Sequence, residues 1–215
     1  MHRVSPEPAG WSLRRGVITY LVTSGLLASA WHSTFEYGLW IVNALAGTLG
    51  VVLGLHAMGS SWRAQLRWSS KQALVGAALG IALVAATQLS ARLLLPLMPP
   101  VLTETRRLYD LLQGTLRPSQ YATVLALVAV AEELVFRGVV TSLCELRFTP
   151  IKTLLLTTTL YVLPLAASGS WLLVAIGLTL GATWTIARLW SKSLLIPLVA
   201  HIIWAEMVFV AMPVG

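Results

Sequence analysis

Long apolar runs separated by short polar segments dominate the chain. A helix that crosses a membrane needs about 20 predominantly apolar residues. Seven runs approach this length, at 16–31, 38–59, 72–95, 121–140, 151–168, 171–189 and 193–212. The pattern therefore predicts an all-α fold, a polytopic membrane bundle of about seven transmembrane helices.

The long connection at 96–120 shows a different pattern. Its leucines recur at helical spacing, at Leu108, Leu111, Leu112 and Leu116. This spacing predicts a short amphipathic helix that lies in the membrane interface. Such a helix either rests on the lipid headgroups, which is the commoner arrangement, or covers a substrate site as a lid.

Small residues recur at every fourth position of the second predicted span, at Ala46, Gly50 and Gly54. A stripe of this kind lets two membrane helices approach closely, so we expect it to serve packing rather than chemistry. No Gly/Ser-rich linker and no change of composition divides the sequence. Residues 1–215 are therefore expected to form a single integral-membrane domain.

The composition excludes a water-soluble or a disordered chain. Of the 215 residues, 57% are hydrophobic and 11% are charged, whereas about 25% of a soluble domain is charged. So few charges cannot cover a water-facing surface, and disorder requires low hydrophobicity and high charge. The single cysteine, Cys144, also excludes an internal disulfide.

The basic residues predict the orientation of the bundle. A net charge of +7 would suggest nucleic-acid binding in a soluble domain, but Lys and Arg between apolar runs set membrane orientation instead. Ten fall on one side of the predicted membrane: Arg3, Arg14, Arg15, Arg63, Arg67, Lys71, Arg147, Lys152, Arg188 and Lys192. The other side has four, Arg92, Arg106, Arg107 and Arg117. This asymmetry predicts a cytoplasmic N-terminus, an external C-terminus and no nucleic-acid partner.

The beginning of the chain imitates a secretory signal peptide. Arg14 and Arg15 precede an apolar stretch that ends in Ala28-Ser29-Ala30, which has the form of a cleavage site. Stop-transfer patterns follow this stretch, so we expect the first span to be retained.

Three charged residues interrupt the fourth predicted span, at Glu132, Glu133 and Arg137. Each costs about 2.5–3.5 kcal/mol at the centre of a membrane helix, so the three must face a polar interior or a water-filled cavity. Glu133 and Arg137 are four residues apart, which places them on one helix face as an ion pair. Glu132 is rotated from Glu133 by about 100° and is free to act as a general base on water. The alternative is a buried ion-pair network that only holds helices together.

The last predicted span contains His201 at its middle. A neutral imidazole can orient a water molecule, donate to an oxyanion or bind a metal. Together with Glu132 and Glu133 it would be a possible zinc-ligand set, but the sequence has no HExxH motif and no second histidine nearby. We therefore expect no metal and no other cofactor.

The segment Glu-Glu-Leu-Val-Phe-Arg at 132–137 resembles the first motif, EExxxR, of the CPBP family, the CAAX-protease and bacteriocin-processing (Abi) glutamic intramembrane proteases. Gly138 is also typical of that motif. The resemblance extends over 121–212, which we interpret as a CPBP-like core preceded by N-terminal spans and an interfacial segment at 1–120.

The later family motifs are incomplete in this chain. His201 matches the histidine of the last motif, but Ala205 stands where the family has Asn or Asp. The middle motif has an aromatic residue followed four residues later by a catalytic histidine, and here Tyr161 is followed by Leu165. Glu206 is a candidate substitute for the polar residue missing at Ala205, but it is rotated by about 100°.

The resemblance implies an intramembrane endopeptidase, in which Glu132 activates water, Glu133 and Arg137 support it, and His201 polarises the reactants. It also implies a hydrophobic or membrane-anchored peptide or protein as substrate, membrane lipid as surroundings, and the plasma membrane of a prokaryote as location. We expect activity far below that of a member with all motifs. The alternatives are a catalytically silent member that binds a peptide or partner protein, and a small transporter, which the lack of an internal repeat disfavours.

Overall fold

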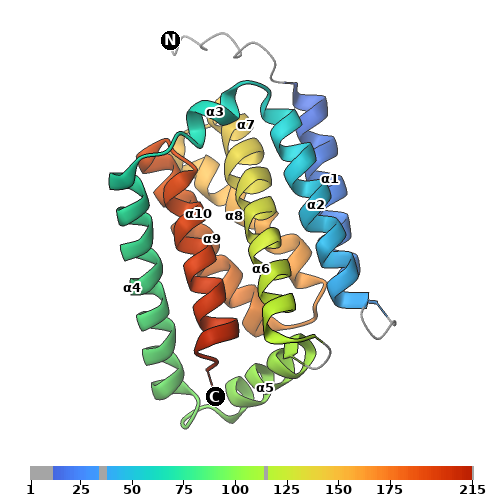
Figure 1. Ribbon diagram of the computed structural model, residues 1–215, viewed down its shortest axis with the longest axis vertical. Helices are drawn as coiled ribbons and strands as arrows, with labels where there is room; N and C mark the ends of the chain where they lie inside the picture. The colour runs from blue at the N-terminus through green and yellow to red at the C-terminus, as the bar shows by residue number, and fades with distance from the viewer. Residues whose placement is uncertain (1–11, 34–37, 114–115, 215) are drawn as a thin grey trace.

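The computed structural model describes residues 12–33, 38–113 and 116–214, so Arg3 lies outside the described part. These residues form helices and contain no strand (Figure 1), which confirms the predicted all-α fold. The elements are α1 (Leu13–Ala30), α2 (Gly38–Met58), α3 (Ser61–Gln65), α4 (Ser70–Leu94), α5 (Pro99–Gln113), α6 (Pro118–Glu132), η1 (Glu133–Val140), α7 (Thr141–Glu145), α8 (Pro150–Ala166), α9 (Trp171–Ser191), α10 (Leu195–Glu206) and η2 (Met207–Ala211).

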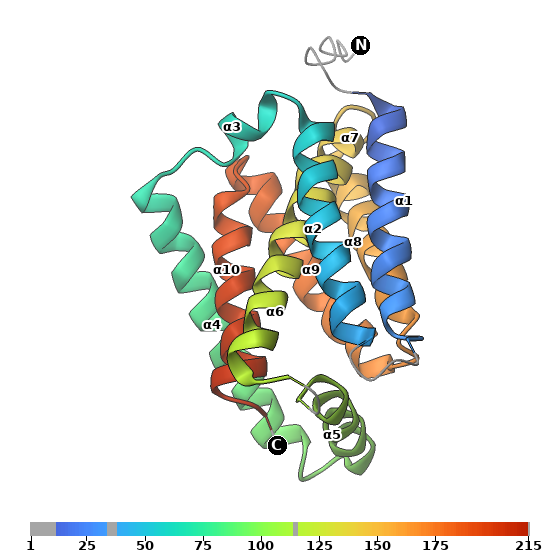
Figure 2. The ribbon, with the colours of Figure 1, turned by 45° about the vertical axis from the view of Figure 1, so that its right-hand side comes forward.

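The long helices run up and down and form one bundle. In Figure 1, α3 and α7 lie at the upper end, whereas α5 and the C-terminal end of the chain lie at the lower end. Figure 2 shows α4 at the edge of the bundle beside α10, and α1 at the opposite edge beside α2. The rod formed by α6, η1 and α7 runs through the middle, so the charged segment 132–137 lies at the centre of the bundle.

The helix bounds follow the predicted apolar runs with shifts at their ends. Within the described residues, α2, α4 and α9 are long and apolar enough to cross a membrane by length and composition, and 150–166 and 195–211 are shorter apolar helices. The number of membrane crossings therefore stays a prediction. The first helix begins before the predicted residue 16, because the hydroxyl of Ser12 accepts a hydrogen bond from the backbone N–H of Arg15 and caps its first turn.

The predicted interfacial helix is present as α5, with two corrections. Leu108 and Leu112 are buried against the bundle, but Leu111 is 47% exposed and points away from it. Leu116 lies beyond the end of the helix and packs beside Leu112 and Tyr121. The apolar face of α5 is therefore narrower than the sequence indicated, and it contacts protein.

The predicted small-residue stripe brings α2 against the central rod. A Cβ atom on Gly50 would lie 2.8 Å from the Cβ of Ala131, and one on Gly54 would lie 3.1 Å from the Cβ of Leu134. Only glycine allows this approach, so the stripe has the packing role expected from the sequence. It fixes the position of the rod on both sides of Glu132 and Glu133.

Glycines also seat α4 on α10. A Cβ atom on Gly76 would lie 2.8 Å from the carbonyl oxygen of Ile196, and one on Gly80 would lie 3.0 Å from that of Ala200. The two helices therefore meet backbone to backbone. This contact supports the segment of α10 that carries His201.

Candidate functional site

The buried charges lie where the central rod changes its winding. Residues 133–140 form a π-helix between two α-helical segments, a rare feature that often marks functional sites. Arg137 Nη1 lies 3.4 Å from Glu133 Oε1, so the predicted i,i+4 pair is present, and both side chains are almost fully buried.

The guanidinium of Arg137 has further partners on two other helices. Its Nη2 donates to the carbonyl oxygen of Gly181 over 3.0 Å. The guanidinium carbon, Cζ, lies 4.2 Å from the centre of the Tyr161 ring and 5.4 Å from the centre of the Trp184 ring. These contacts stabilise the positive charge in the bundle.

The ring of His201 joins the two glutamates. Its Nδ1 lies 2.9 Å from Glu133 Oε1, and its Nε2 lies 3.8 Å from Glu132 Oε2. Glu132, which is rotated from Glu133 on the central rod, approaches the other nitrogen of the same ring. The four residues singled out in the sequence, Glu132, Glu133, Arg137 and His201, form one buried cluster.

Glu132 faces a cavity, whereas Glu133 and Arg137 lie behind it. The cavity has a volume of about 130 Å³ and a mostly apolar wall. Glu132, Tyr161 and His201 are among its lining residues, and Glu133 and Arg137 are not. A carboxylate, an imidazole and a phenol thus meet at a small, partly open cavity, an arrangement suited to acid–base chemistry on a water molecule.

The two residues that depart from the family motifs also line the cavity. Leu165 and Ala205 both line its wall, so each position does face the site but has no polar group to offer. Glu206 is not among the lining residues, because the next position on α10 points elsewhere. It does not replace the polar group that Ala205 lacks.

Helix α5 closes one side of this cavity. Leu108 and Leu112 are part of the wall. The hydroxyl of Tyr109 donates to the carbonyl oxygen of Val208 over 2.7 Å and accepts from the N–H of Val214 over 3.1 Å. Burial raises the pKa of Tyr109, so this hydroxyl remains a donor at neutral pH. Helix α5 thus covers part of the cavity and is held to the C-terminal end of the chain.

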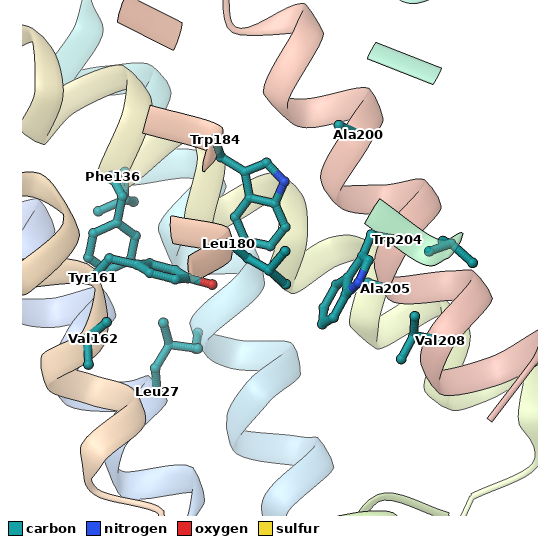
Figure 3. Close-up of a cluster of buried hydrophobic side chains, with 13 residues drawn as sticks. Leu27, Phe136, Tyr161, Val162, Leu180, Trp184, Ala200, Trp204, Ala205 and Val208 are labelled. Carbon is teal, nitrogen blue, oxygen red and sulfur yellow. The ribbon is translucent and has the colours of Figure 1, made fainter. Parts of the chain in front are cut away.

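Two further residues contact the cluster: Tyr161, noted in the sequence only as the aromatic residue of the middle motif, and Trp184, which was not predicted. The hydroxyl of Tyr161 donates to Glu132 Oε2 over 3.0 Å. The indole of Trp184 stacks on the imidazole of His201, with ring centres 3.8 Å apart at an angle of 19°. Figure 3 shows both rings within the core cluster. For Tyr161 the signal was the aromatic position of the middle motif. For Trp184 it was a large amphipathic ring inside an apolar span instead of at its end, where such rings are usual.

Metal binding finds no support in the described part of the chain. It contains no group of three or more His, Cys, Asp or Glu side chains placed to hold a metal ion. The expectation that no cofactor is needed stays a prediction.

Comparison with known proteins gives one family. Residues 115–207 match the family model described as type II CAAX prenyl endopeptidase Rce1-like. This segment contains Glu132, Glu133, Arg137, Tyr161 and His201, and it confirms the resemblance drawn from the EExxxR motif. No curated protein and no solved structure gave a significant match.

Proposed function

Because residues 115–207 belong to the Rce1-like, CAAX-protease group of the CPBP family, we propose that the chain is an intramembrane endopeptidase that uses Glu132 to activate water. The observation that carries the proposal is the meeting of Glu132 and His201 at the wall of one cavity, with 3.8 Å between their polar atoms. A water molecule can contact both groups at this separation, which is the geometry that general-base catalysis requires.

The hydrogen-bond partners divide the chemical roles. The carboxylate of Glu133 at Nδ1 of His201 keeps the hydrogen on that nitrogen. Nε2 then accepts a hydrogen bond from the water and orients it. Glu132 takes the other proton as the water oxygen attacks the peptide carbonyl carbon, and later transfers it to the amine that leaves when the C–N bond breaks. Arg137 holds Glu133 in place.

The lining of the cavity indicates the class of substrate. Its wall is largely aliphatic and aromatic, and Leu108 and Leu112 of α5 form part of it. An apolar segment of a membrane-anchored peptide or protein fits such a wall better than a polar peptide does. We propose the plasma membrane of a prokaryote as its location. The asymmetry of the basic residues supports seven membrane crossings and a cytoplasmic N-terminus.

A second function is favoured by one observation. Leu165 and Ala205 leave two sides of the cavity apolar, although a working protease of this kind needs groups that stabilise charge on the substrate oxygen. The chain would then bind a hydrophobic peptide or a partner membrane protein without cleaving it.

Peptidase assays in reconstituted liposomes separate these functions. We would compare the wild type with Glu132→Gln and Leu165→His on a panel of quenched fluorescent peptides with apolar segments. Glu104→Gln is the matched control, because Glu104 lies on α5 and pairs with Arg107 away from the cavity.

For an active protease we expect slow wild-type cleavage, a loss of about 10²–10⁴-fold in Glu132→Gln, and an unchanged rate in Glu104→Gln. Wild-type cleavage that survives Glu132→Gln would refute the mechanism. Cleavage that appears only in Leu165→His would establish the silent, peptide-binding function.

A further inference from the structure

We propose that the phenol of Tyr161 is a catalytic group that stabilises the oxyanion of the reaction, in the role that a histidine at position 165 would otherwise have. The inference rests on the proposed endopeptidase function. Tyr161 lines the cavity, is 5% exposed, and donates to Glu132 Oε2 over 3.0 Å. Its O–H is therefore beside the base at which water is activated.

His201 is not available for this role while its ring is neutral. Its Nδ1 lies 2.9 Å from a buried carboxylate oxygen of Glu133. Because an ionised carboxylate only accepts hydrogen bonds, we infer that the hydrogen of a neutral ring lies on Nδ1. The opposite nitrogen, Nε2, then has a lone pair and no hydrogen, so it accepts hydrogen bonds and cannot donate to an oxyanion.

Two other side-chain donors on the described cavity wall are engaged, whereas Nε1 of Trp40 and Nε1 of Trp184 have no hydrogen-bond partner and neither bonds Glu132. The indole N–H of Trp204 donates to Thr87 Oγ1, and the amide of Asn43 donates to the carbonyl oxygen of Leu39. The nitrogen of Trp184 lies on the side of its ring away from the Tyr161 hydroxyl (Figure 3). In the described residues, the donor that hydrogen-bonds Glu132 is the phenol of Tyr161.

The packing around Tyr161 holds its hydroxyl in place. Its ring meets Phe136 and Trp184 edge to face, at centre distances of 5.1 and 6.3 Å. The guanidinium of Arg137 lies over its face at 4.2 Å. A donor fixed in this way loses little freedom when the reaction begins, which is what makes such groups effective.

The reaction itself frees the phenol. Before attack, the O–H is bonded to the negative carboxylate of Glu132. When Glu132 takes a proton from water, its charge disappears and it becomes a weaker acceptor, while the carbonyl π electrons move to the substrate oxygen. The phenol then donates to this oxyanion. The oxyanion re-forms the carbonyl as the C–N bond breaks and Glu132 returns the proton to the amine.

Tyr161→Phe tests the role, because it removes only the hydroxyl and leaves the ring in the core. We expect kcat for the best peptide of the panel to fall about 10²–10³-fold, with KM unchanged, since the bond to the oxyanion exists only in the transition state. Tyr20→Phe is the matched control. Tyr20 also packs edge to face on Phe136, but its hydroxyl donates to the carbonyl oxygen of Leu160 and it does not line the cavity. We expect its kcat to match the wild type.

The double variant Tyr161→Phe/Leu165→His separates catalysis from structure. Position 165 faces the same cavity, so we expect kcat of the double variant to be at least tenfold higher than that of Tyr161→Phe. A purely structural role of the hydroxyl does not predict this rescue. A wild-type kcat in Tyr161→Phe, or a loss without this rescue, overturns the inference alone. Absence of wild-type cleavage, or cleavage that survives Glu132→Gln, overturns the proposed function and this inference with it.

Discussion

Arg137 is the positively charged residue of the buried cluster, and it makes contacts with several partners. It is fully buried, and it contacts the carboxylate of Glu133, the carbonyl oxygen of Gly181 and the faces of two aromatic rings. Glu133 is equally buried but also has the ring of His201. Removing either partner leaves a different buried group behind, so the two losses should differ.

We expect Arg137→Ala to destabilise the protein by about 3–5 kcal/mol, the usual loss when one partner of a buried pair is removed. Glu133→Gln should destabilise it less, because the guanidinium of Arg137 keeps its bond to Gly181 and its contacts with the rings. Denaturant titration of the purified protein in mild detergent measures both. The control is Arg107→Ala, which removes the ion pair between Glu104 and the half-exposed Arg107. It should change the free energy of unfolding by less than about 1 kcal/mol. Small and equal losses in Arg137→Ala and Glu133→Gln would contradict this account.

At the level of residues, the sequence predicted the charged part of the site. Glu132, Glu133, Arg137 and His201 stand out because charge and imidazole are rare in apolar spans. The family resemblance marked Tyr161 as a motif residue without a role for its hydroxyl, and nothing in the sequence assigned Trp184 to the site. Their contacts cross between helices, and the sequence spacing within one helix does not determine how two helices rotate against each other.

Among the elements, α9 shows how closely the site is packed. A Cβ atom on Gly181 would lie 2.6 Å from Cδ1 of Tyr161 and 3.4 Å from Nη2 of Arg137. Glycine at this position lets α9 approach α8 and the central rod and lets its carbonyl reach the guanidinium.

Gly181→Ala should therefore destabilise the protein by about 1–3 kcal/mol, the range for overpacking a core, because the new methyl group displaces the ring of Tyr161. Gly25→Ala on α1 is the matched control. A Cβ atom there meets nothing within 4 Å, and alanine favours a helix over glycine by about 0.5–1 kcal/mol. Thermal unfolding in detergent should show a lower midpoint for the first variant alone, and equal midpoints would argue against the tight contact.

Elements were predicted well where hydrophobicity alone defines them. The apolar runs at 38–59 and 171–189 correspond to α2 and α9 within a residue or two. The five-residue helix α3 and the π-helical winding of 133–140 were not predicted. A short helix has no repeated apolar pattern, and π-helical winding follows from tertiary packing around Glu133 and Arg137 instead of from local preference.

Across the whole molecule, basic residues of the described part lie in two groups, one at each end of the helix bundle. The connections that carry Arg67, Arg147 and Lys192 lie at the end of α3 and α7, whereas α5 carries Arg106 and Arg107 at the other end (Figure 1). The arrangement is the one expected if the end with α3 faces the cytoplasm.

Cysteine labelling tests this orientation. In a Cys144→Ala background, we expect Arg106→Cys to react with a membrane-impermeant maleimide in intact cells, and Arg67→Cys to react only after the cells are opened. Both positions are exposed, so exposure does not distinguish them. Labelling of both residues from the same side would contradict the predicted orientation.

The close contact between α4 and α10 links the surrounding membrane to the position of His201. Helix α4 has 25 residues, which at 1.5 Å per residue gives a length of about 37 Å, more than the roughly 30 Å hydrocarbon core of a bilayer. A helix of excess length tilts, and it tilts more in a thinner bilayer. Because there is no room for a side chain between Gly76 or Gly80 and the carbonyl oxygens of α10, we expect a tilt of α4 to shift the helix that holds His201. We therefore expect the thickness of the surrounding lipid to influence the distance between His201 and Glu132.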